Sequence, residues 1–414
     1  MNMIFLPLYI DPGTGSMLFS ILIGAAATLF FLAKAAVIKV KLFFSGKKNG
    51  SLQDISVCDP YVIYCEGIQY WNVFKPVVDE FEKRAIPLVY YTSAKNDPVF
   101  ERQYQFIRAE FIDEGNAAFA RLNLLSAGIV VMTTPGLQVY QLKRSKNVKH
   151  YAHVLHMTND ATTYRLFGLD YFDSVLLTGD YQKDDLCALE RQRGLPPKQL
   201  VTVGCSYLDV LADKMQSVPD EAEHRFTVLV SPSWGAAGLL KRFGEKLLDP
   251  LVATGWTILV RPHPQSKKSE ADTLSRLEER YKAVPNIEWD YNRDNIYAMK
   301  RADIMISDFS GIIFDYTFLC DKPVIYANAD IDLRPYDAYD LKKSMWQFTV
   351  LEKMGIKLEE KDFPQIKDVI QNAADSPALA AERQLAKRTA WMHEGEAGCR
   401  IADFMIKTVS EKST

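Results

Sequence analysis

The sequence predicts an α/β protein with two Rossmann-like domains, a cleft between them and an N-terminal membrane helix. Apolar runs of strand length alternate with helix-like segments along most of the 414 residues, a pattern typical of parallel sheets covered by helices. The alternation stops at the polar stretch Ala212–His224 and then restarts, which indicates two domains joined by a link. An uncharged run near the N-terminus, Met17–Ala33, adds the membrane helix.

The composition describes a folded protein and excludes several classes of function. Hydrophobic residues make up 48% of the chain and charged residues 24%. A net charge of −3 argues against a nucleic-acid-binding surface over the whole chain, because such surfaces need clustered lysine and arginine. The six cysteines form no C-x-x-C pair, so they indicate neither a disulfide framework nor a zinc site and fit a reduced, cytosolic compartment.

The N-terminal segment, residues 1–46, is expected to anchor the chain in the cell membrane. Met17–Ala33 is close to the lower limit of about 20 apolar residues for a spanning helix, and no lysine or arginine precedes it. Five lysines follow it within the next 15 residues, which places the remaining chain on the cytoplasmic side. A buried core hairpin and an interfacial helix with snorkelling lysines are the alternatives.

The first Rossmann-like domain is expected at residues 60–214, after a polar linker at residues 47–59. Its helices are predicted from apolar periodicity and its strands from short apolar runs. The expected strands are Pro60–Tyr64, Pro87–Tyr91, Gly128–Met132, Val148–His156, Ser174–Thr178 and Leu200–Gly204, and the expected helices are Trp71–Lys83, Asn116–Leu125 and Lys183–Arg193.

The second Rossmann-like domain is expected at residues 225–390. The strand Phe226–Val230 precedes a loop and a helix that runs through Leu251, and Asp294 is expected to cap a later helix. From Asp340 onward the chain is expected to be mostly helical, and residues 391–414 to form a helix that returns toward the first domain. The other predicted elements are the strands Thr257–Val260 and Ile287–Trp289 and the helix Leu274–Tyr281.

The stretch Arg301–Ala327 carries the strongest functional signal. It is interpreted as a strand, a polar turn at Ser307–Gly311, a helix apolar on nearly every face and a second strand. Serine and glycine at the start of a helix leave free backbone N–H groups at its positive end, which suits a phosphate at Ser310 and Gly311. Asp315, the single charge of the helix, would then hold a ribose. The alternative is an ordinary core helix whose Asp315 is bonded to protein.

The sequence Arg261-Pro262-His263-Pro264 supplies a second candidate site at the end of a predicted strand. Two prolines rigidify the turn and present the arginine and histidine side chains in one geometry. Arg261 and a hydrogen-bond-donating His263 suit a diphosphate whose leaving group gains charge. The alternative is a rigid corner in which Arg261 forms an ion pair with protein.

Three histidines, His150, His153 and His156, recur at a spacing of three residues. On a helix they would share a face and suggest a metal, but the flanking Tyr, Val and Leu favour a strand, on which His153 and His156 point to opposite faces. His156 at the strand end is the candidate general base, and a structural histidine is its alternative. We therefore predict neither a metal nor a cofactor, and no Walker, dinucleotide-binding or G-x-S-x-G motif is present.

The candidate residues follow the ends of predicted strands in both domains. His156 follows Val154-Leu155, His263 follows Leu259-Val260, and Ser307-Asp308 follow Met305-Ile306. Because ligands of open α/β sheets bind outside the carboxyl ends of the strands, a ligand is expected in the cleft.

The order of these motifs resembles the CDP-glycerol glycerophosphotransferase family of wall teichoic acid synthesis. The resemblance rests on V-R-P-H-P, then about forty residues, then A-D-I-M-I-S-D-F-S-G-I-I-F-D-Y and K-P-V-I-Y, and it covers about Lys149–Tyr339. The sequence departs from the family's usual pattern at three places: Met157-Thr158-Asn159 replace a glycine and a nearby lysine, Gly235 replaces an arginine, and Ser206-Tyr207 replace Pro-Arg.

The resemblance implies a GT-B-like fold and transfer of a glycerol phosphate unit from CDP-glycerol, or a related CDP-polyol, to an acceptor hydroxyl with release of CMP. The acceptor would be a polyol-phosphate polymer or a lipid-linked molecule at the membrane. His156 and His263 would be the catalytic residues, and Asp315 would hold the ribose. The further donor-binding residues would be Arg261, Ser307, Asp308, Ser310 and Gly311.

Two other classes of function stay open at this stage. One is a GT-B glycosyltransferase that uses a nucleotide sugar for a surface polysaccharide. The other is a membrane-anchored scaffold that kept the fold but lost the chemistry. Release of UDP rather than CMP, or absence of nucleotide binding, would distinguish them from the phosphotransferase.

Overall fold

Two parallel β-sheets, each flanked by helices, make up the part of the chain that the structure describes. A computed structural model describes residues 58–412 except 220–222, 293 and 328–331. The described residues belong to one compact unit. The predicted membrane anchor lies outside the described residues, and within them no helix is long and apolar enough to cross a membrane.

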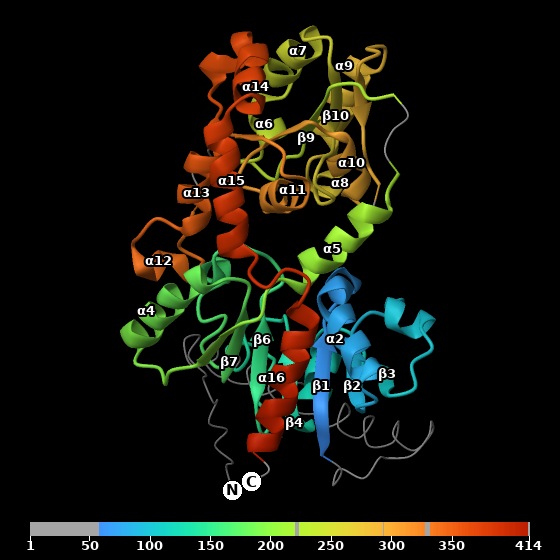
Figure 1. Cartoon of the computed structure of the whole chain (residues 1–414), viewed down its shortest axis with the longest axis vertical. Coiled ribbons are helices and arrows are strands. Elements are labelled where there is room, and N and C mark those ends of the chain that lie inside the picture. Colours follow the sequence, from blue (N-terminus) through green and yellow to red (C-terminus); the bar gives the residue numbers. More distant parts are fainter. Residues whose placement is uncertain (1–57, 220–222, 293, 328–331, 413–414) are drawn as a thin grey trace, which may run out of the picture. The chain divides into compact units, whose positions relative to one another are not determined.

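The first sheet has the strand order β3-β2-β1-β4-β6-β7-β8, with the short β5 paired to β4, and every pairing is parallel (Figure 1). Its strands are β1 Asp59–Cys65, β2 Leu88–Thr92, β3 Ile107–Phe111, β4 Ser126–Met132, β5 Asn147–Val148, β6 Tyr151–Val154, β7 Ser174–Leu177 and β8 Gln199–Thr202. Its helices are α2 Trp71–Lys83, α3 Asn116–Leu122, α4 Lys183–Arg193 and α5 Ser206–Ser217.

The second sheet has the order β11-β10-β9-β12-β13-β14, again parallel throughout, which is the doubly wound order 3-2-1-4-5-6. Its strands are β9 Thr227–Val230, β10 Thr257–Val260, β11 Ile287–Trp289, β12 Ile304–Ser307, β13 Val324–Tyr326 and β14 Gly355–Lys357. The helices are α6 Leu239–Phe243, α7 Glu245–Ala253, α8 Ser266–Ser269, α9 Ala271–Tyr281, α10 Ile296–Arg301, α11 Ile312–Cys320, α12 Ala338–Leu341, α13 Trp346–Met354, α14 Ile366–Ala374, α15 Pro377–Ala390 and α16 Ala397–Glu411.

The prediction of two parallel-sheet α/β domains is therefore confirmed, and the differences are local. The sequence analysis did not predict two strands, β3 and β14. Residues Ala212–Ser217, expected in the interdomain link, instead continue α5. The helix expected to run through Leu251 is two helices, because Gly244 between them has φ +45°, a value that a helix interior does not allow.

The C-terminal helices connect the two sheets. α15 packs against α11 and α13 of the second sheet, and after a break at residues 391–396 α16 packs against α2, β1 and β4 of the first (Figure 1). The buried Asp209 carboxylate of α5 holds this turn, because it accepts hydrogen bonds from Trp391 Nε1 (2.8 Å), Gly395 N (2.9 Å) and Ala397 N (3.1 Å). A carboxylate at the start of α16 also suits the helix dipole.

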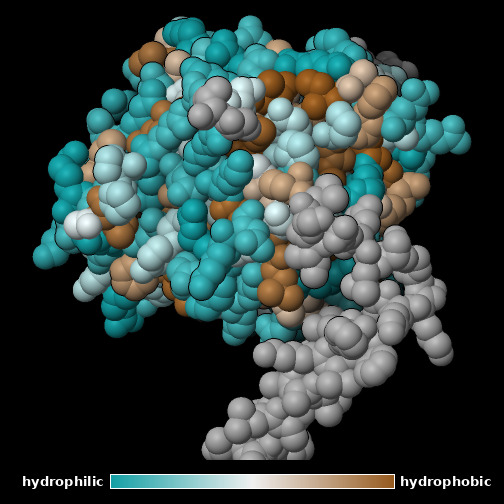
Figure 2. Space-filling view, turned by 90° about the horizontal axis from the view of Figure 1, so that it is seen from below, coloured by the Kyte–Doolittle hydropathy of each residue, from teal (hydrophilic) through white to brown (hydrophobic). Residues whose placement is uncertain are grey.

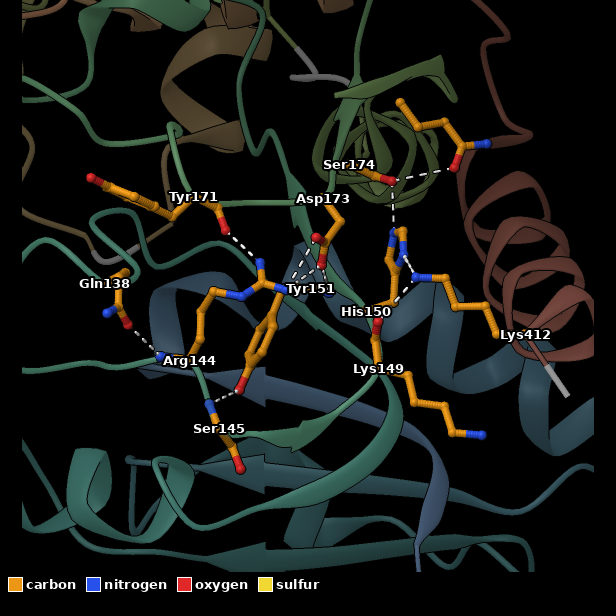
Figure 3. A network of polar contacts seen from close by, with 11 residues as sticks. Gln138, Arg144, Ser145, Lys149, His150, Tyr151, Tyr171, Asp173, Ser174 and Lys412 are labelled. Carbon is orange, nitrogen blue, oxygen red and sulfur yellow. Dashed lines mark hydrogen bonds and ion pairs between the residues drawn. The ribbon is translucent and has the colours of Figure 1, made fainter. Parts of the chain in front are cut away.

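The end of α16 is fixed by His150, which directly precedes β6 and lies between Lys412 and Ser174 (Figure 3). Lys412 Nζ lies 2.8 Å from His150 Nδ1 and donates to Lys149 O at 3.0 Å, and His150 Nε2 lies 2.7 Å from Ser174 Oγ. Burial, with a contribution from Lys412, lowers the pKa of His150 to about 4, so this histidine is neutral and structural.

The surface seen from below the view of Figure 1 is mostly hydrophilic, with hydrophobic residues in separate patches (Figure 2). Together with the four buried clusters around the sheets, this indicates that most apolar side chains of the described residues are packed inside.

Asp209→Ala is expected to lower the free energy of unfolding by about 2 kcal/mol, because it leaves the N–H donors of buried Trp391 and Ala397, and that of Gly395, without their acceptor. The measurement is urea denaturation followed by tryptophan fluorescence. The exposed Asp213→Ala, one helical turn further along α5, is the matched control and should change stability by less than about 0.5 kcal/mol. Equal effects of the two variants would contradict this role of Asp209.

Candidate active site

The candidate site lies at the point where the strand order of the second sheet reverses. β9 and β12 are neighbours there, although the two strands β10 and β11 and the five helices α6 to α10 separate them in the sequence. The loop 231–238 follows β9 and the loop 308–311 follows β12, so both start at the carboxyl edge of the sheet. Ligands of doubly wound sheets bind at this place.

The side chains of Asp308 and Ser307 join these two loops through hydrogen bonds. The Asp308 carboxylate accepts hydrogen bonds from Ser233 N and Leu239 N, each at 3.0 Å, and the Ser307 hydroxyl donates to Ser231 O at 2.5 Å. Both side chains are buried. Burial raises the pKa of Asp308, and the hydrogen bonds from Ser233 and Leu239 oppose that shift. The sequence analysis assigned both residues to donor binding, whereas this geometry gives them the task of positioning the loops.

A pocket of about 540 Å³ opens above these loops. It brings together three residues predicted from the sequence, His263, Ser310 and Gly311, with two aromatic side chains that were not predicted, Trp234 and Tyr336. The other lining residues are Ser233, Ala237, Phe309, Asp332 and Pro335. No lysine or arginine is among the lining residues that the structure describes.

The backbone sets the tautomer of His263. Gln265 N donates a hydrogen bond to His263 Nδ1 at 3.1 Å, so Nδ1 is the acceptor nitrogen and the proton of the neutral ring resides on Nε2. Burial lowers the pKa of His263, while Asp308 and Glu270 oppose this shift. The ring is therefore neutral at pH 7 and presents one N–H donor, as the sequence analysis expected of a residue that contacts a diphosphate.

The N-terminus of α11 forms another wall of the pocket. The amides of Gly311 and Ile312 find no acceptor in the described chain, whereas Ile313 N and Phe314 N bond to Ser310 O and Gly311 O. A Cβ atom at position 311 would lie 3.3 Å from the Asn159 amide oxygen, so the glycine allows Asn159 of the first domain to approach closely. The two domains thus meet at the site predicted for phosphate.

Asp315 lies one helical turn further along α11 and does not line the pocket. Within the described chain its half-buried carboxylate has no hydrogen-bond or ion-pair partner, and burial raises its pKa to about 7. Its charge adds to the burial that raises the pKa of Cys205 and of Tyr207 on α5, so it faces that helix. An unpartnered carboxylate with a raised pKa is a candidate ligand-binding group.

Arg261 forms an ion pair with protein, which was the alternative to donor binding in the sequence analysis. Its guanidinium forms an ion pair with Asp290 and donates to Asn292 O at 2.8 Å, and only 12% of the side chain is exposed. The arginine therefore stabilises the corner between β10 and β11, and the structure does not bring it to the pocket.

His156 lies on the first domain, beyond the end of β6. Its Nδ1 is 3.3 Å from the Tyr164 hydroxyl, which also lies 3.0 Å from His153 Nε2, and the ring packs edge-on against Tyr70 at 5.0 Å. The expectation that His153 and His156 point to opposite faces is wrong, because both rings contact the Tyr164 hydroxyl. β6 ends at Val154, so the alternation of strand faces does not extend to His156. Burial lowers the pKa of His156 to about 4.

The segment after His156 contacts the second domain repeatedly. The Asp160 carboxylate accepts hydrogen bonds from Trp346 N (3.0 Å) and Gln347 N (2.8 Å) and so caps α13. Leu166 N donates to Pro335 O at 3.0 Å. The sequence analysis did not identify Asn159, Asp160 or Tyr164 as functional, and the departure at Met157-Thr158-Asn159 was the one local signal.

Comparisons with known proteins agree with this geometry. Residues 235–375 match the family model "CDP-Glycerol:Poly(glycerophosphate) glycerophosphotransferase", a region that contains the pocket residues His263, Ser310 and Gly311. No curated protein matches the chain by sequence. The resemblance stated from the sequence is thus confirmed for residues 235–375 of the second domain.

Solved structures show the same fold at low sequence identity. The wall teichoic acid polymerase TagF aligns over 93% of this chain and 97% of its own with 14% identity and a TM-score of 0.57. A Listeria monocytogenes protein described as a putative UDP-N-acetylglucosamine 2-epimerase aligns over 86% of this chain and 98% of its own, with 14% identity and a TM-score of 0.55. The Neisseria meningitidis epimerase bound to UDP-GlcNAc aligns over 84% and 100% with 12% identity and a TM-score of 0.51. The GT-B-like fold is therefore shown.

Asp315→Asn is expected to stabilise the protein at alkaline pH. The folded-state pKa of about 7 lies above the ordinary value of 3.8, so the wild type loses stability as pH rises from about 4 through 7. The variant lacks this loss. Its free energy of unfolding should exceed that of the wild type by at least about 1 kcal/mol at pH 8, and this difference should decrease toward pH 4. Urea denaturation at several pH values measures it, with exposed Asp213→Asn as control. A difference independent of pH would contradict the raised pKa.

Proposed function

We propose that the chain transfers a glycerol phosphate unit, or a similar polyol phosphate, from CDP-glycerol to an acceptor hydroxyl and releases CMP. The observation that carries the proposal is the pocket at the carboxyl edge of the second sheet. There His263, whose Nε2 carries the proton, and Gly311, whose amide has no acceptor in the described chain, line one pocket inside the region that matches the glycerophosphotransferase family. A related solved structure, of a TagF variant soaked with CDPG, supports the choice of donor.

The donor diphosphate would be held without cationic side chains. The N-terminus of α11 offers backbone N–H groups and the positive end of the helix dipole, and His263 adds a neutral donor. Such groups suit the charge that develops on the phosphate of the departing CMP, because they are already oriented before the reaction. Asp315, facing α5, would accept hydrogen bonds from ribose hydroxyls.

The acceptor side would use His156 as the base. Because burial lowers its pKa to about 4, the imidazole is neutral at physiological pH and one ring nitrogen has a free lone pair. The acceptor hydroxyl gives its proton to this nitrogen while its oxygen bonds to the phosphorus that carries glycerol. The bond from that phosphorus to the bridging oxygen breaks, and CMP leaves with the electron pair. Positioning and charge stabilisation are the main contributions in phosphoryl transfer.

The acceptor and the location are also part of the proposal. A polyol-phosphate polymer or a lipid-linked molecule would enter from the side of His156, with the catalytic domains on the cytoplasmic side of the cell membrane. The predicted anchor Met17–Ala33 supports membrane association from the sequence alone.

The test of this function compares donors. The purified full-length chain is incubated with CDP-glycerol, CDP-ribitol and UDP-sugars, and the released nucleotide is identified by chromatography. CMP from CDP-glycerol or CDP-ribitol supports the proposal. Release of UDP would identify a glycosyltransferase instead, and absence of both release and nucleotide binding would identify a scaffold.

His263→Ala is expected to lower the rate of CMP release at least about 100-fold with the fold intact, because it removes a donor that faces the leaving phosphate. The measurement is the initial rate at saturating CDP-glycerol, with circular dichroism to verify folding. His224→Ala is the control, since that exposed side chain pairs with Asp303 and does not line the pocket. A wild-type rate from His263→Ala would exclude its catalytic role.

A further inference from the structure

We propose that Tyr164 is a positioning residue that fixes the tautomer of His156, so that the proton resides on Nδ1 and the lone pair on Nε2. The inference rests on the proposed function, in which His156 is the base. It follows from a line of three buried or half-buried side chains, His153, Tyr164 and His156, joined through one hydroxyl group.

The Tyr164 hydroxyl has two histidine nitrogens within reach and one proton to donate. It lies 3.0 Å from His153 Nε2 and 3.3 Å from His156 Nδ1. If it donates to one nitrogen, its oxygen can accept from the other. The states of the two histidines are therefore linked.

The geometry around His156 decides which way the bridging proton points. Its Nδ1 lies against the Tyr164 hydroxyl, so Nε2 is the nitrogen left to take the proton of an acceptor hydroxyl, and a base needs its lone pair there. The neutral His156 ring then carries its proton on Nδ1 and donates it to the Tyr164 oxygen. The single Tyr164 proton is left for Nε2 of the fully buried His153, whose own proton resides on Nδ1, an atom without a partner in the described chain.

The direction of the remaining contacts follows from this state. Tyr164 O–H donates to His153 Nε2, and the Tyr164 oxygen accepts the proton of His156 Nδ1. The neutral His156 ring then carries its lone pair on Nε2, for which no partner is found in the described chain. The opposite tautomer would place an N–H donor where the proposed base needs a lone pair.

The Tyr164 hydroxyl is held firmly enough for this task. Its ring is enclosed by His153 at 5.0 Å and by His156 at 6.3 Å, and burial raises its pKa, so the phenol stays protonated. Its backbone is fixed as well, because Asp337 N of the second domain donates to Tyr164 O at 3.0 Å. The group that orients the base is thus attached to the domain that carries the donor pocket.

The tautomer can be observed directly by nitrogen NMR of the full-length protein labelled with 15N-histidine. The chain has six histidines, and the resonances of His156 are identified by their loss in His156→Gln. We expect a protonated Nδ1 and an unprotonated Nε2 at neutral pH. A protonated Nε2 in the wild-type protein would overturn the proposal without any variant.

Tyr164→Phe removes the hydroxyl and keeps the ring. We expect His156 to lose its preference for the Nδ1–H form and kcat to fall about tenfold or more, with an unchanged KM for CDP-glycerol. Tyr70→Phe is the matched control, because its ring also packs against His156 but no hydrogen bond joins the two, and it should keep the wild-type tautomer. An unchanged tautomer in Tyr164→Phe would overturn the proposal.

The two kinds of failure are distinguishable. If the wild-type protein does not turn over CDP-glycerol, the proposed function fails, while the tautomer of His156 is still measured. If CDP-glycerol is turned over and Tyr164→Phe lowers kcat without changing the tautomer, Tyr164 acts on the structure alone and the positioning role is refuted.

Discussion

The buried cluster around Arg193 is the constraint on which the cleft depends. The guanidinium pairs with Asp170 of the first domain and with Asp337 and Asp340 of the second, each at 2.7 Å. Arg193 and Asp337 are 9% and 2% exposed, so removing the arginine would leave carboxylates buried together without a counter-charge. Breaking a buried pair in this way typically costs about 3–5 kcal/mol.

The position of the cluster explains why it matters for the site. Asp337 also accepts from Phe167 N at 2.8 Å, and its own amide donates to Tyr164 O. Pro335 and Tyr336, which line the donor pocket, therefore stay beside the segment that carries Tyr164. The Asp160 cap on α13 and the Asn159 contact with Gly311 extend the same interface. One interface thus sets the distance between the two halves of the proposed reaction.

Local patterns explain why much of the second sheet could be predicted from the sequence. The stretch from β12 through α11 to β13 follows from short apolar runs, a helix start at Ser310-Gly311 and the break at Pro323. The strand β3 was missed although Ile107, Ala109 and Phe111 alternate with Arg108 and Glu110, because an alternation of only five residues is a weak signal. The Arg261–Asp290 ion pair spans 29 residues, and no local pattern indicates it.

The site shows the same division between local and distant effects. The tautomer of His263 depends on the backbone amide of Gln265, only two residues away. The sequence analysis could therefore predict from the rigid turn that His263 donates a hydrogen bond. The positioning role of Asp308 depends on amides 75 and 69 residues earlier, so the sequence analysis placed this carboxylate at the donor. Tyr164 had no signal of its own, because its importance comes from two histidines that meet only when the chain turns after β6.

The departures from the family pattern acquire a physical meaning in this structure. Where the family usually has a glycine and a nearby lysine, Asn159 packs against Gly311 and donates to Gln347 Oε1 at 3.1 Å. Asn159 thus joins the two domains through a neutral amide, and the described lining of the pocket contains no lysine or arginine. In the proposed function the charge of the diphosphate would therefore be met by oriented dipoles, namely the start of α11 and the His263 N–H. Such dipoles are effective when they are held in place. The buried ion pairs around Arg193, which join the two domains, would then also keep these dipoles in position for the donor.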